Sequence, residues 1–141
     1  MFEPLDKLDG KRTVRQEATF RKSVLGPYLA VGISSYSGEM KDEQFAAVVE
    51  AFNDCPSFTV TDADGPAKFT ASPLSFPNLG DETLALRFAA SAQDTDFEVD
   101  AISVRVGHNV ISVLQIALAG LDSGASEKAA LSALANLEEA A

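Results

Sequence analysis

The amino-acid sequence predicts an α+β fold, in which a single antiparallel β-sheet meander carries two amphipathic helices packed on one face. Between residues 57 and 118, strand-like segments follow one another with only short turns between them. One helical pattern precedes this series and a second follows it. Helices are therefore segregated from a run of hairpins, which is typical of α+β rather than of alternating α/β folds.

The segment 97–118 is the centre of the predicted sheet. Two runs rich in valine and isoleucine join at Gly107-His108-Asn109, and β-branched residues favour strands. The second run is apolar at odd and even positions, which indicates a strand that is covered on both faces or is central in its sheet. In the first run the apolar positions change phase near Asp100-Ala101. A β-bulge is the simplest explanation of this change, and a strand that is apolar on both faces is the alternative.

Residues 1–23 are expected to form an N-terminal leader, partly mobile and containing a short strand at best, and residues 24–141 a single domain. Residues 28–36 alternate as a strand does, with Leu29, Val31 and Ile33 on the core face. From about residue 41 to 54, apolar residues recur at helical spacing and predict a helix that ends before Pro56. Its stripe comprises Phe45, Val48, Val49 and Phe52.

Short strands are predicted over 57–61, 68–72 and 83–92, and the proline-rich stretch 72–77 as a sheet edge or crossing loop. The turn at 62–65 starts like a calcium-binding EF-hand loop, but loop position 12 is Pro73 instead of glutamate, so it is interpreted as an acidic turn. Ser126 is expected to cap the final helix. The apolar stripe of that helix comprises Ala130, Leu131, Leu134 and Leu137.

The composition restricts the classes of function. The net charge is −10, and 17 of the 21 acidic residues follow position 23, since only four precede it. Such a body repels phosphate backbones and anionic membrane surfaces, so neither nucleic-acid binding nor direct membrane insertion is expected. Residues 1–4 do not begin a signal peptide, which leaves a cytoplasmic location or an export signal that is absent from this sequence.

Motifs for catalysis and for cofactors or metals are missing from the sequence. His108 is the only histidine and falls in a predicted turn, so a multi-histidine metal site is excluded. Cys55 is the only cysteine and follows the first helix, whose C-terminal dipole disfavours a thiolate. Cys55 is interpreted as a free thiol or as the orphan of a lost pair. We therefore expect no enzyme activity, no catalytic residue, no metal and no cofactor.

Three residues are the best candidates for contacts with a ligand. Arg87 and Arg105 lie inside predicted strands of a strongly acidic body, where a guanidinium can recognise a carboxylate or phosphate. Tyr36, at the end of the first strand of the domain, offers a ring face and a hydroxyl. The alternative for both arginines is a cross-strand ion pair with aspartate or glutamate.

From residue 24 to about 140 the sequence resembles the PknH-like extracellular sensor domains of actinobacterial kinases and lipoproteins. The resemblance rests on GISSYS, FNDCPSFTV, SPLSFPNLGDETLALRF and ISVRVGHNVISVL in this order, followed by a helix. It implies an extracytoplasmic α+β domain with a cleft for a small ligand, secreted or anchored by a lipid upstream. Cys55 matches one half-cystine position of the kinase sensor domain, whose two disulfides a single cysteine cannot form.

Two functions follow as hypotheses. The first is a non-enzymatic sensor-like or lipoprotein domain of the cell envelope that binds an unknown small ligand in a cleft. The second is a protein–protein interaction module of the envelope that has no small-molecule ligand. A closed apolar pocket with a few convergent polar groups would favour the first, and a flat apolar patch the second.

Overall fold

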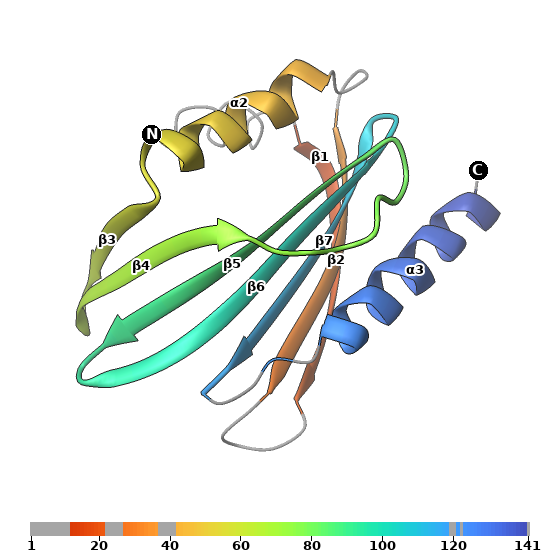
Figure 1. Ribbon diagram of the computed structural model, residues 1–141. Helices are drawn as coiled ribbons and strands as arrows, with labels where there is room; N and C mark the ends of the chain where they lie inside the picture. Colours follow the sequence, from red (N-terminus) through yellow and green to blue (C-terminus); the bar gives the residue numbers. More distant parts are fainter. Residues whose placement is uncertain (1–11, 22–26, 37–41, 119–120, 122, 141) are drawn as a thin grey trace.

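The computed structural model describes residues 12–21, 27–36, 42–118, 121 and 123–140, with side chains except at 12–14, 21, 42–45, 123 and 140. These residues form seven strands and two helices (Figure 1). In chain order the elements are β1 (Arg12–Arg21), β2 (Tyr28–Tyr36), α2 (Asp42–Asp54), β3 (Ser57–Asp62), β4 (Gly65–Pro73), β5 (Glu82–Ala92), β6 (Thr95–Val106), β7 (Asn109–Ala117) and α3 (Ser123–Ala140).

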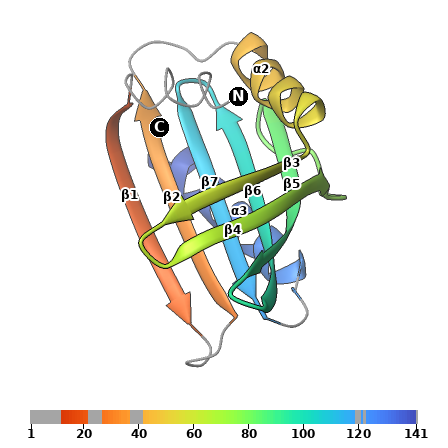
Figure 2. The same cartoon turned by 90° about the vertical axis from the view of Figure 1, so that its left-hand side faces the viewer.

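The strands form one sheet in the order β1-β2-β7-β6-β5-β4-β3, and every neighbouring pair is antiparallel. Strands β3 to β7 are the predicted meander, joined by short connections. The hairpin β1–β2 docks on the outer side of β7, so the chain crosses the whole sheet between β2 and β3 (Figure 2). The α+β fold class is confirmed, with the hairpin as an addition to the meander.

The hairpin β6–β7 is the centre of the sheet, as the sequence predicts. Val106 pairs with Asn109, so the turn consists of Gly107 and His108 alone. Gly107 has a φ of 61°, a conformation that glycine adopts without strain at the first central position of a type II′ turn. The largest core residues of this hairpin, Ile102, Val104, Ile111 and Val113, are at most 1% exposed.

The phase change in β6 is not a bulge. The register of β6 is continuous against both β5 and β7 through Asp100 and Ala101. Phe97 and Val99 therefore face one side of the sheet, and Ile102 and Val104 face the other. Of the two explanations, the strand that is apolar on both faces is the correct one.

The expectation that both helices pack on one face is wrong. Helix α3 covers the face of Ile102, Val104, Ile111 and Val113, against which its Ala130 and Ala133 are buried. Helix α2 lies on the opposite face, where the ring of Phe52 is 5.5 Å from that of Phe88 on β5. Figures 1 and 2 show the two helices on opposite sides of the sheet, and strands β3 and β4 curl over the α2 side. Central strands that are apolar on both faces need a cover on both.

Strand β1 is longer than the short strand expected for the leader. It pairs with β2 along its whole length, with an irregularity between Arg12 and Val14. The rest of the predicted leader, residues 1–11 and 22–23, lies outside the described residues. The alternation of β1 was hard to see because an edge strand needs few apolar residues, and only Val14, Ala18 and Phe20 signal it.

Helix α3 begins at Ser123, three residues before the expected cap. Ser126 lies inside the helix, is fully buried, and donates a hydrogen bond of 3.2 Å from its Oγ to Oε1 of Gln115 on β7. The cap assignment is therefore wrong, because the hydroxyl bonds to the sheet beneath the helix. Of the predicted stripe, Leu134 and Leu137 pack on the core, whereas Leu131 is 45% exposed.

The loop between β4 and β5, residues 74–81, crosses the α3 side of the sheet. Leu74, Phe76 and Leu79 pack against the core, as expected of the crossing loop. The loop is tied down where the Asp81 N–H donates to the Arg105 carbonyl, 2.8 Å, and the Asp81 carboxylate accepts from the Gly107 N–H, 2.8 Å. Gly80, just before, has a φ of 59° and lies against the backbone of β6.

Five phenylalanines form a cluster on the concave α2 side. This phenylalanine cluster consists of Phe52, Phe58, Phe69, Phe88 and Phe97, from α2, β3, β4, β5 and β6. Neighbouring ring centroids are 5.2 to 6.5 Å apart, in edge-on, tilted and stacked arrangements that aromatic rings prefer. Packing within the cluster holds α2 and the curled strands β3 and β4 against the rest of the sheet. The side chain of Phe45, the other aromatic of the predicted stripe, lies outside the described residues.

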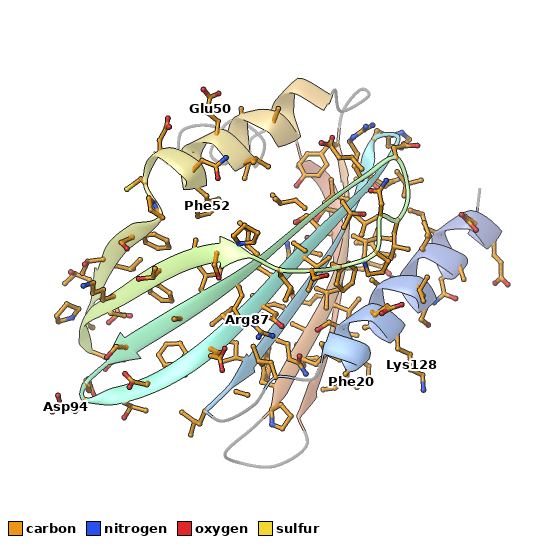
Figure 3. The ribbon with its side chains drawn as sticks, in the orientation of Figure 1. Phe20, Glu50, Phe52, Arg87, Asp94 and Lys128 are labelled. Carbon is orange, nitrogen blue, oxygen red and sulfur yellow. The ribbon has the colours of Figure 1, made fainter. Side chains whose placement is uncertain are left out.

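We expect Phe52→Ala to lower the free energy of unfolding by about 2–3 kcal/mol, below the cost of a fully buried ring because Phe52 is half-buried. The ring points from α2 into the phenylalanine cluster (Figure 3). Urea denaturation measures the effect. Phe20→Ala is the control, since Phe20 is 59% exposed and its removal should change stability by less than about 0.5 kcal/mol. Equal effects would show that Phe52 does not anchor α2.

Candidate functional site

The largest hollow described lies between α3 and the hairpin β1–β2 and has a volume of about 720 Å³. We call it the α3 groove. Its floor consists of Leu29, Val31 and Ile33 of β2, with Ala18 and Phe20 of β1 beside them. Its helix wall contains three alanines, Ala125, Ala129 and Ala133. Polar residues complete the lining: Gln16, Glu17, Lys128, Ser132 and Asn136.

The sequence of α3 explains why this groove is open. Ala125, Ala129 and Ala133 recur every fourth residue and therefore lie on one face of the helix. Larger side chains, Leu134 and Leu137, pack on the core instead. Small residues toward β1 and β2 hold the backbone of α3 over the core but do not fill the space above Leu29, Val31 and Ile33. The groove therefore exists because α3 has alanines on the face toward β1 and β2 and leucines on the face toward the core.

The two charged residues that line the α3 groove differ in whether they have an ion-pair partner. Lys128 and Glu17 are the charged residues in its lining. The Glu17 carboxylate accepts a hydrogen bond of 2.6 Å from Nη2 of Arg15, so it is already neutralised. Among the residues that the structure describes, no carboxylate forms an ion pair with Lys128. The ammonium of Lys128 is therefore available to an anionic group at the groove.

A second hollow, of about 270 Å³, lies on the concave side of the sheet, and we call it the concave hollow. Small residues form much of its lining: Ala30, Gly32, Ala101, Ser103 and Ser112. Arg15 lies across Gly32, where a Cβ would come within 3.5 Å of Nη2 and 3.2 Å of the Gln16 carbonyl oxygen. This hollow is smaller and more polar than the α3 groove, so it is the weaker candidate.

A row of four polar side chains, of which all but Arg87 are buried, links the sheet to the first turns of α3. Arg87 donates two hydrogen bonds to the Asp100 carboxylate, from Nε to Oδ1, 2.7 Å, and from Nη2 to Oδ2, 2.8 Å. Asp100 is fully buried, and the Arg87 side chain is 34% exposed. Asp100 lies opposite Gln115 in the sheet, and Gln115 bonds to Ser126. These four residues, the buried polar row, join β5, β6, β7 and α3.

The Arg87–Asp100 pair changes the ionisation of the arginine. The hydrogen bond to Asp100 raises the pKa of Arg87 above its ordinary value, burial lowers it by less, and the nearby charges of Asp100 and Glu98 raise it further. A raised arginine pKa contributes stability that is complete below the ordinary arginine pKa and is lost only as the pH rises above it. The Arg87 guanidinium therefore keeps its charge at every physiological pH.

The three predicted ligand contacts do not meet. Arg87 faces the α3 side and is engaged by Asp100, with Glu98 Oε2 3.7 Å from its Nε. Arg105 and Tyr36 face the opposite side of the sheet. Arg105 lies opposite Val110 in the register of β6 and β7, and Tyr36 packs against Val110, so all three side chains share that side. Arg105 is buried, with Nη1 3.6 Å from Asp81 and Nε 3.9 Å from Glu82. Binding of a ligand by these residues stays a prediction, but they do not form one site.

The remaining candidates for chemistry are isolated. In the described part of the chain, no group of three or more histidine, cysteine or acidic side chains is placed to hold a metal ion. Cys55 is half-buried directly after α2, and its Sγ donates to the carbonyl of Ser57, 3.3 Å. His108 is exposed in the β6–β7 turn. Neither described helix is long and apolar enough to cross a membrane.

Sequence reasoning missed the α3 groove altogether. Two of its signals are visible in the sequence: the apolar face of 29–33, and alanines at 125, 129 and 133. They lie about 90 residues apart, and only the antiparallel pairing of β2 with β7 brings β2 under α3. No local sequence pattern predicts the pairing of β2 with β7.

The architecture defines an α+β class with one seven-stranded antiparallel sheet and a helix on either side. Among solved structures the chain is similar to the extracellular domain of PknH from Mycobacterium tuberculosis, with a TM-score of 0.61 and 10% sequence identity. The match covers 89% of this chain and 66% of that domain. At this identity the likeness shows a shared fold alone. No protein-family model matches the chain, and no curated protein matches it by sequence.

Proposed function

We propose that this chain is a non-enzymatic, extracytoplasmic sensor-like domain that binds a small ligand in the α3 groove. The groove carries the proposal, because about 720 Å³ with an aliphatic floor and a few polar groups fits the usual description of a small-molecule site. The shared fold supports it, since the similar domain is the extracellular part of its protein. An export signal or lipid anchor upstream of this sequence is part of the proposal.

Methyl NMR of the labelled protein against a panel of small metabolites tests the binding. We expect shift changes to concentrate on the methyl groups of Leu29, Val31, Ile33 and Ala129, which line the groove. Changes confined to Ala30 and Ala101 would assign the ligand to the concave hollow instead. No change with any small molecule, together with capture of an envelope protein on the same face, would favour the interaction module.

A pair of α3 variants is the matched control. Ser132 and Ala135 are both exposed on α3, but only Ser132 lines the groove. Ser132→Phe should fill the groove and weaken binding by about tenfold or more, while Ala135→Phe adds the same ring outside it and should not. Equal affinities of the two variants would contradict the assignment. Protease accessibility of the native protein in intact cells tests the extracytoplasmic location separately.

A further inference from the structure

The lining of the α3 groove extends over several residues of both α3 and β2, which bears on the length of its ligand. On α3 the lining extends from Ala125 to Asn136, about 16 Å at 1.5 Å per residue. On β2 it extends from Leu29 to Ile33, about 13 Å. An extended chain advances roughly 1.2 Å per bond, so a linear chain of roughly 12 atoms matches these lengths. An aliphatic floor of alternating branched side chains suits methylene groups along its whole length.

The charges indicate which end group such a chain carries. Lys128 lines the groove without an ion pair to any described residue, whereas Glu17 is neutralised by Arg15. Figure 3 shows Lys128 and Phe20 near the same end of α3, the end at which the helix begins. A cation therefore borders an apolar groove, in a chain with a net charge of −10. An ammonium beside an aliphatic floor complements a ligand with an apolar chain and a single anionic head group.

We propose that the α3 groove binds a free, single-chain anionic amphiphile: an unbranched aliphatic chain of about 12 carbons that ends in a carboxylate or phosphate. The chain lies on Leu29, Val31 and Ile33, and the head group pairs with the Lys128 ammonium. This inference rests on the proposed function and specifies the ligand of the same site. The ligand is a free molecule rather than a lipid held in a bilayer, because the acidic body is repelled by anionic membrane surfaces.

Isothermal titration with dodecanoate, below its critical micelle concentration, tests the chain and the charge. We expect saturable binding of one dodecanoate per chain. Hexanoate, which keeps the head group and loses half the chain, should bind at least about tenfold more weakly, since each buried methylene contributes. Dodecyltrimethylammonium keeps the chain and reverses the charge, and should also bind about tenfold more weakly. Equal affinities for the two 12-carbon ligands would overturn the anionic preference.

Charge-reversal variants locate the head group. Lys128→Glu should weaken dodecanoate binding about tenfold and abolish the preference over dodecyltrimethylammonium. Lys68→Glu makes the same change in net charge at an exposed position on β4, outside the groove, and should leave both affinities unchanged. If both variants weaken dodecanoate equally, the preference arises from net charge and the head-group assignment is wrong.

Two further outcomes separate this inference from the proposed function. If dodecanoate fails to bind while another small molecule shifts the groove methyl groups, the amphiphile is wrong and the ligand-binding function stands. If no small molecule shifts the groove methyl groups, the proposed function fails as well. If the protein co-sediments with anionic phospholipid vesicles but does not bind dodecanoate, the proposal is overturned, because the protein then recognises lipids in a membrane surface and not a free amphiphile.

Discussion

Replacing Arg87 with methionine is expected to lower the free energy of unfolding by about 3 kcal/mol, the lower end of the range for a broken buried ion pair. Methionine keeps the bulk of the side chain but removes both hydrogen bonds to Asp100, 2.7 and 2.8 Å. The Asp100 carboxyl group, which is fully buried, would then have lost its cationic partner, and a buried unpaired carboxyl group is costly. Chemical denaturation monitored by circular dichroism measures the loss.

A double-mutant cycle supplies the control for this prediction. Asp100→Leu removes both hydrogen bonds of Arg87, but Glu98 Oε2 stays 3.7 Å from its Nε and water reaches its one-third-exposed side chain, so the loss should be smaller. The double variant Arg87→Met with Asp100→Leu replaces the pair by two apolar side chains and should recover much of the stability. A loss below about 1 kcal/mol for Arg87→Met would contradict the importance of the pair.

Gly80→Ala is expected to destabilise the protein by about 3 kcal/mol, from two causes that add. The φ of 59° at Gly80 disfavours any side chain, and an added Cβ would lie 2.6 Å from the Arg105 carbonyl oxygen. The same atom would lie 2.8 Å from Cγ1 of Val104. The loop cannot retreat easily, because the neighbouring Asp81 N–H is hydrogen-bonded to that carbonyl oxygen. Thermal and urea unfolding measure the loss.

Gly107→Ala is the matched comparison, since Gly107 has nearly the same φ, 61°, but nothing lies within 4 Å of its added Cβ. It should cost about 1 kcal/mol, from backbone conformation alone. The difference between the two variants isolates the steric contact of the β4–β5 loop with β6. If the two losses are the same, the loop is not pressed against β6 as the structure shows.

The sequence predicts most of the individual strands and both helices correctly. Strand 28–36 agrees with the structure, and the α2 pattern ends at Asp54 as expected, because alternation and helical spacing are local properties. Strand β1 was underestimated, since the edge of a sheet requires little hydrophobicity. For the phase change in β6 the bulge was the simplest explanation from the sequence, and it is wrong, because the cross-strand register is continuous.

The candidate site depends on long-range pairing that local patterns do not contain. The arginines were selected because cations are scarce in the body of the chain, yet Arg87 lies opposite Asp100 in the register of β5 and β6. Knowing that register would have identified the ion pair at once. Conversely, the α3 groove combines the apolar face of β2 with alanines of α3, and neither set is unusual alone.

The pairing of β2 with β7 has a consequence for folding kinetics. Within the meander β3 to β7, each strand pairs with the strand that precedes or follows it in the chain, so this part of the sheet can assemble early. Tyr28 must find Ile116 across most of the chain, which makes docking of the β1–β2 hairpin a late step. The α3 groove exists only when this hairpin and α3 are both in place. A ligand bound in the groove would therefore slow the detachment of the β1–β2 hairpin. A ligand that dissociates more slowly would also give the native state a longer lifetime.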